Sequence, residues 1–316
     1  MIKNMKRIIF AIIAIAFLFS FELKAETSPY HSLRYAATAR TAGLAGAVVA
    51  IPNDAGTISI NPASISTVND KHFSASFIKH ILDINSGNVS YIREFEETGT
   101  FAGFVSYTNY GSFTRADRDG NQTGTFNSSD LNLALCYSNE LDSNFYYGVT
   151  AKYIYMNIDK YNSSAVALDA GLIYLMPDIR TNVGFSILNV GTQLSTFDGT
   201  KDKLPLDIRL GVSHLLRGLP LLVNFSLHHL ADETDDFFEK FANFSIGGEL
   251  YIGQYVQLRL GYDNHIRRYS APSNEKKLAG LSGGIGLKLE DFNFDYSMSQ
   301  VGIAATLHRF SLYLNF

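Results

Sequence analysis

A regular alternation of apolar and polar side chains runs from Lys71 to the end of the chain. In the last stretch, one face carries Phe310, Leu312, Leu314 and Phe316, and the other carries Arg309, Ser311, Tyr313 and Asn315. Residues 206–213, 255–262 and 291–298 repeat this pattern. Successive side chains of a β-strand point to opposite faces, so each run predicts a strand that separates an apolar from a polar environment.

We count about fourteen such runs of about ten residues. They are centred near Phe73, Val89, Phe104, Leu133, Val149, Leu168, Phe185, Leu210, Val223, Ile246, Leu258, Ile285, Phe294 and Leu312. The links after even-numbered runs are short, whereas most links after odd-numbered runs are longer and polar, as at 109–128, 190–204, 231–240 and 263–279. An even strand count and alternating short and long links are typical of outer-membrane barrels with both termini in the periplasm.

Composition favours the same fold class. Charged residues make up 18% of the chain, against about a quarter in soluble proteins. The mean hydropathy of +0.02 is too low for a bundle of membrane helices, but it suits strands with one lipid-facing side. We therefore predict an all-β protein of the bacterial cell outer membrane, with residues 70–316 forming a transmembrane antiparallel β-barrel. A soluble β-sandwich also alternates, but it would not need ordered short and long links.

The first 25 residues read as a signal peptide. A basic start at Lys3, Lys6 and Arg7 precedes an apolar run, and Ala25 offers a small residue for cleavage. The run of about 14 apolar residues is shorter than the roughly 20 that span a bilayer. The net charge of −4 gives no reason to expect nucleic-acid binding.

Residues 26–69 lack the alternation and contain two turn signals, at 53–56 and 61–63. This density of turns predicts a compact, folded-back segment. The stretch TARTAGLAGAVVAIPNDAGTISINPASI resembles the N-terminal signature of FadL-like outer-membrane barrels, in particular the PorV/PorQ family of the type IX secretion system. The resemblance implies an N-terminal plug inside or at the periplasmic mouth of the barrel, with structural or gating roles for Arg40, Gly43, Gly46, Asn53, Asp54, Asn61 and Pro62.

Two further features are similar to the same family. The segment LPLDIRLGVS at 204–213 resembles one in PorQ, and the chain length also fits PorQ better than PorV. The terminal Phe316 resembles the aromatic signal that outer-membrane assembly machinery recognises. The family implies a non-enzymatic component of type IX secretion, which binds secretion proteins or cargo C-terminal signal domains through its outer loops and contacts outer-membrane lipid.

An alternative interpretation is a FadL-like passive transporter of hydrophobic small molecules. It requires an apolar pocket near the plug and a lateral opening in the wall. A third possibility is a purely structural barrel. Bound lipid in the purified protein would favour the transporter, and co-purification with secretion proteins would favour the secretion component.

The residues give little support to catalysis or metal binding, and we expect no cofactor. The sequence GLSGG at 280–284 fits the G-x-S-x-G pattern, but a strand and not a helix follows it, so no nucleophile elbow is expected. His228 and His229 precede an acidic run, but adjacent strand residues point to opposite faces, so we expect no specific metal site.

Several polar or charged residues fall on the predicted inward faces. We expect Cys136 to be a small lumen-facing residue. The charged residues should neutralise one another across the lumen or bind the plug, because a lone charge would be costly there. They are Lys152, Asp169, Asp207, Arg209, Glu249, Arg259 and Lys288.

Overall fold

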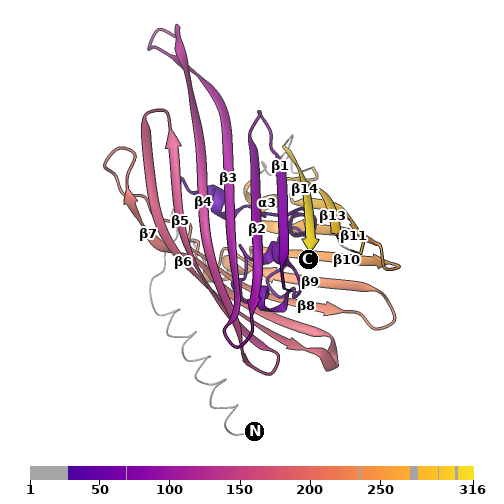
Figure 1. Ribbon diagram of the computed structural model, residues 1–316. Coiled ribbons are helices and arrows are strands. Elements are labelled where there is room, and N and C mark those ends of the chain that lie inside the picture. Colours follow the sequence, from indigo (N-terminus) through magenta and orange to yellow (C-terminus); the bar gives the residue numbers. More distant parts are fainter. Residues whose placement is uncertain (1–27, 69, 235, 271–276, 291, 303–304) are drawn as a thin grey trace.

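The computed structural model describes residues 28–68, 70–234, 236–270, 277–290, 292–302 and 305–316. The signal peptide predicted at 1–25 lies outside these residues. Within them, fourteen antiparallel strands form a closed barrel, in which each strand pairs with its neighbours in sequence and β1 pairs with β14 (Figure 1). None of the helices in this part of the chain is long and apolar enough to cross a membrane.

All fourteen predicted strand centres lie in strands, in the expected order. The strands are β1 His72–Lys79, β2 Asn85–Phe95, β3 Gly99–Ala116, β4 Gln122–Asp142, β5 Phe145–Ile158, β6 Tyr161–Met176, β7 Thr181–Ser195, β8 Asp207–Leu215, β9 Leu221–Leu227, β10 Phe244–Ile252, β11 Val256–Asp263, β12 Leu281–Lys288, β13 Phe292–Gln300 and β14 Thr306–Asn315.

The two faces of the wall have different chemistry, as the alternation predicts. In β14, Phe310 and Leu312 are exposed on the outside, whereas Arg309 and Ser311 are buried on the inside. Many of the large exposed hydrophobic residues lie on the outward faces of the strands. A closed barrel with an apolar outer surface leaves no unpaired strand edge facing lipid, which is the requirement for a β-protein that spans a membrane.

The two ends of the barrel differ, and we identify the end with the short turns and both barrel termini as periplasmic. The prediction of a loop at 109–128 is wrong for most of these residues. Strands β3 and β4 continue through it as a hairpin that projects beyond the rest of the barrel, and only residues 117–121 form the turn (Figure 1). A change of register between Asn109 and Ser112 and a stacked pair, Phe113 and Phe126, lie within this hairpin.

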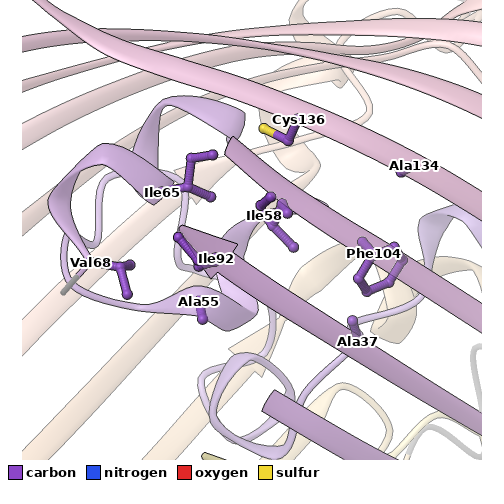
Figure 2. Close-up of a cluster of buried hydrophobic side chains, with 10 residues drawn as sticks. Ala37, Ala55, Ile58, Ile65, Val68, Ile92, Phe104, Ala134 and Cys136 are labelled. Carbon is purple, nitrogen blue, oxygen red and sulfur yellow. The ribbon is translucent and has the colours of Figure 1, made fainter. Parts of the chain in front are cut away.

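Residues 28–68, which we call the inner segment, lie inside the barrel. They contain η1 His31–Arg34, α2 Ala39–Gly43, η2 Ala55–Thr57 and η3 Pro62–Thr67, and the other helices are η4 Pro177–Ile179, η5 Phe237–Ala242 and α3 Asn264–Tyr269. Figure 2 shows Ile58 and Ile65 of the inner segment beside Ile92, Phe104 and Cys136 of the wall. Cys136 therefore faces the lumen, as predicted, and the inner segment supplies much of the apolar core.

Candidate functional site

The turn residues of the inner segment act as helix caps. The Asp54 carboxylate accepts a hydrogen bond from the Gly56 backbone N–H at 2.8 Å, and the Asn61 side chain accepts one from Ala63 N–H at 3.1 Å. Such caps satisfy backbone donors that a helix start leaves unpaired. The Asn61 amide also donates to the backbone carbonyls of Val49 and of Leu172 in β6. Asn61 thus joins the inner segment to the wall.

Arg40 joins the inner segment to a different part of the wall, at β10, through a buried group of charges. Its guanidinium lies 2.6 Å from Glu249 of β10 and 3.2 Å from Asp54. Arg259 of β11 lies 2.6 Å from Glu249 and 2.8 Å from Asp295 of β13. Buried charges in such a chain offset one another's loss of hydration only while every member is present.

The other predicted inward charges follow the same rule. Lys152 pairs with Asp169 at 2.6 Å, and Arg209 pairs with Asp207 at 2.7 Å. Lys288 differs, because it is exposed and lines the periplasmic mouth. The expectation that these charges neutralise one another or bind the inner segment is confirmed for the other six.

A belt of inward-facing glycines seats the inner segment against the wall. At each position a Cβ atom would approach the inner segment too closely. At Gly184 the added carbon would lie 2.2 Å from the Val49 carbonyl oxygen, and at Gly171 it would lie 2.1 Å from Asn61 Oδ1. The belt consists of Gly148, Gly171, Gly184, Gly211, Gly247 and Gly261. The belt was not predicted from sequence, although a glycine on the polar face of each of these six strands was its signal.

The other residues predicted to form the plug or the assembly signal lie at turns, at close contacts with the wall, or at the end of the chain. Gly43 packs against Arg259 and Gly284, while Gly46 and Asn53 have positive φ angles of 75° and 55° at turns of the inner segment. Pro62 lies against Gly148 and Gly171. Phe316 follows β14 and is exposed, and its role in assembly stays a prediction.

The G-x-S-x-G pattern forms no nucleophile elbow. Ser282 lies within β12, faces the lumen and donates a hydrogen bond to the Gly43 carbonyl oxygen at 3.2 Å. An elbow needs a sharp turn from strand to helix, whereas here the strand continues to Lys288. Small lumen-facing residues explain the pattern.

The geometry predicted for His228 and His229 is wrong. Both residues follow the end of β9, and a positive φ of 56° at His229 brings the two rings to a centroid distance of 4.8 Å, beside His265. Burial lowers the pKa of His228 and lowers that of His265 to about 3, so these imidazoles are neutral at pH 7. Within the described residues, no group of three or more His, Cys, Asp or Glu side chains is arranged to hold a metal ion.

Two hollows lie on opposite faces of the wall at β1, β2 and β3. On the outside, a mainly apolar notch of about 480 Å³ is lined by residues that include Ala75, Phe77, Gly87, Val105 and Phe310. On the inside, a cavity of about 40 Å³ lies between the inner segment and the wall, beside Tyr35, Ala37, Ile78 and Phe104. Asn88 of β2 lines both hollows. At this point the two hollows lie on opposite faces of the same strand.

A third hollow, of about 820 Å³, opens at the periplasmic mouth. Its lining includes Pro52 and Asn53 of the inner segment and the charged residues Arg40, Arg259 and Asp295. The buried charges therefore lie at the inner limit of a basin of mixed polarity, while the inner segment separates this basin from the cavity beside Asn88.

No protein-family model matches the sequence, and a search of curated proteins gives no match. The fold has solved counterparts. The toluene transporter TbuX of Ralstonia pickettii is 12% identical, with a TM-score of 0.58 over 88% of this chain and 96% of TbuX. The P. putida toluene transporter TodX is 12% identical, with a TM-score of 0.60 over 89% and 98%. A Pseudomonas aeruginosa FadL homologue is 11% identical, with a TM-score of 0.51 over 87% and 97%.

The protein is thus a FadL-like β-barrel of the bacterial outer membrane. At these identities the likeness defines the fold and not the activity. None of the three proteins is described as a type IX secretion component, so the PorV/PorQ assignment stays a prediction.

Proposed function

We propose that this barrel lets small hydrophobic molecules cross the outer membrane passively, with the inner segment as its plug. The observation that carries the proposal is the pair of hollows at Asn88, which lines a lipid-facing notch and a lumen-facing cavity. A hydrophobic molecule concentrates in lipid, so an entry from the side avoids the aqueous phase.

Small residues make the notch. Ala75 and Gly87 face lipid among much larger neighbours, such as Phe77 and Tyr107. Their own side chains are too small to cover the backbone between β1 and β2. The buried residues Ser76, Asn88 and Ser311 form its inner part. A molecule resting in the notch is therefore close to residues that face the lumen.

The inner segment closes the other side of this point. The Asn88 amide donates a hydrogen bond to the Ala37 carbonyl oxygen at 2.7 Å. The cavity of about 40 Å³ beside this bond holds about one water molecule, far below the roughly 300 Å³ of an ordinary ligand pocket. Passage would require the residues around Ala37 to move, which is the gating role we propose for the plug.

The size and polarity of the notch suggest a small apolar substrate, and two proteins of similar fold are described as toluene transporters. We therefore choose toluene as the first probe. The predicted gating residues, from Arg40 to Pro62, would act by holding the plug and not by contacting the substrate.

Gly87→Phe should block the entry. The new ring would occupy the part of the notch beside Asn88, and a barrier raised by only about 1.4 kcal/mol would slow passage about tenfold. The measurement is the initial rate of radiolabelled toluene uptake by intact cells that carry the protein in their outer membrane. Gly103→Phe is the matched control, because Gly103 has open space at its Cβ position on the adjacent strand β3.

We expect uptake to fall in Gly87→Phe and to stay unchanged in Gly103→Phe. Equal uptake in both variants and in wild type, with equal amounts of folded barrel, would exclude the notch as the entry. Uptake equal to that of cells without the protein would contradict the transport function itself.

The type IX secretion role remains the second candidate, and it rests on the sequence motifs. The projecting hairpin of β3 and β4 offers a contact surface for secretion proteins or cargo signal domains. Replacing residues 113–125 with a short turn removes the end of the projecting hairpin and should leave the barrel wall intact. If the protein serves secretion through this hairpin, cargo release should fall, and normal release would count against that contact.

A further inference from the structure

The barrel wall is unequal in height around its circumference. Strands β3 to β7 have 14 to 21 residues, whereas β9, β11 and β12 have only 7, 8 and 8. A strand that crosses the hydrocarbon core needs about 9–11 residues. On the low side of the wall, the connections must therefore supply part of the apolar surface that faces lipid.

The connection between β9 and β10 carries an exposed aromatic group at this place. Phe237, Phe238 and Phe241 of η5 are 61%, 75% and 46% exposed. Their rings contact one another, with centroid distances of 5.9 Å and 5.5 Å from Phe237 to the other two. We call these three residues the phenylalanine triad. Exposed aromatic side chains grouped in this way mark an interaction surface.

The triad is continuous with the lipid-facing wall. Two residues after η5, Phe244 begins β10 on the outer face and stacks on Phe225 of β9 at 6.0 Å, with Tyr262 of β11 at 6.2 Å on its other side. Because the chain lacks Trp, such Tyr and Phe residues form its interfacial girdle.

Polar contacts hold the opposite side of η5 to the neighbouring loop. The Asn264 amide of α3 donates to the Ala242 carbonyl oxygen at 2.8 Å, and Arg268 lies 3.6 Å from Glu239. His265 contacts Asn243 at 3.0 Å. These contacts fix η5 against protein on its polar side, which leaves the three rings facing away from it.

We propose that the phenylalanine triad inserts into the outer leaflet of the membrane and completes the lipid-facing surface above the short strands. The partner is lipid, and its acyl chains and interfacial region receive the three rings. This contact holds the low rim of the barrel at the membrane surface, opposite the projecting hairpin. It is independent of the transport proposal.

The absence of Trp allows a direct test. Phe238→Trp introduces a single reporter, which is reconstituted in vesicles of phosphatidylcholine with brominated acyl chains and exposed to aqueous iodide. Phe225→Trp on the wall is the lipid-facing control, and Phe113→Trp on the projecting hairpin is the water-facing control. Phe241→Trp repeats the test at a second position of the triad, in case one variant fails to fold.

We expect brominated lipid to quench Phe238→Trp and Phe241→Trp as it quenches Phe225→Trp, with little effect of iodide. Quenching by iodide and not by lipid, as at Phe113→Trp, would overturn the proposal. Protection from both quenchers would overturn it as well, because the rings would then be covered by protein, such as a second copy of the barrel.

Discussion

Replacing Arg40 with methionine should release the inner segment from the wall and open the lumen. Methionine keeps much of the side-chain volume but removes the charge, so the buried carboxylates of Glu249 and Asp54 lose their shared partner. Removing one member of a buried ion pair costs about 3–5 kcal/mol. The open state, rare in the wild type, should become about a hundredfold or more better populated on that scale.

Ion conductance of the purified protein in a planar lipid bilayer measures this opening. Arg40→Met should show frequent open events that the wild type lacks. The double variant Arg40→Met/Glu249→Gln is the control, since it restores the net charge of the buried cluster while Arg259 stays paired with Asp295, and it should recover part of the closed state. Identical conductance in the wild type and Arg40→Met would show that this charge cluster does not hold the plug.

Gly184→Ala should have the second largest effect, by steric means. The added methyl carbon would lie 2.2 Å from the Val49 carbonyl oxygen and 2.7 Å from its carbonyl carbon. Backbone atoms cannot rotate away as a side chain can, so the inner segment must move. Overpacking of this kind costs about 1–3 kcal/mol. Conductance should rise, and protease cleavage within residues 44–53 of the folded barrel should become faster.

Gly248→Ala is the matched control for that substitution. It changes the same residue type in a strand of the same wall, but its Cβ position has only Leu221 Cδ1 nearby, at 3.7 Å. We expect Gly248→Ala to behave like the wild type in both measurements. If the two alanine variants are equally closed and equally resistant to protease, the glycine belt does not seat the plug.

The barrel could be predicted from sequence because its signal is local and repeated. Each strand from β1 to β14 carries its own alternation, and the residues on either side of Leu210 or Leu312 report the two environments directly. The inward charges were also predictable, since a charge on the polar face of a membrane strand needs a partner. The identity of each partner was not, because Arg40 and Glu249 are 209 residues apart in sequence.

The errors have physical causes. Residues 109–128 are mostly polar and were therefore predicted to form a loop. Beyond the bilayer neither face of a hairpin contacts lipid, so its strands need no alternation of apolar and polar residues. The His228 and His229 geometry failed because β9 ends one residue before the pair and a left-handed turn follows. The notch beside Asn88 depends on small residues from neighbouring strands, so no single stretch of sequence contains it.

The most direct test of the transport function is to identify what the protein holds in its own membrane. The barrel would be extracted from the native outer membrane in mild detergent, with bound small molecules, lipids and proteins identified by mass spectrometry. Our account predicts the barrel with a stoichiometric hydrophobic small molecule that is absent from Gly87→Phe. Recovery with type IX secretion subunits or cargo signal domains, and without such a molecule, would contradict it.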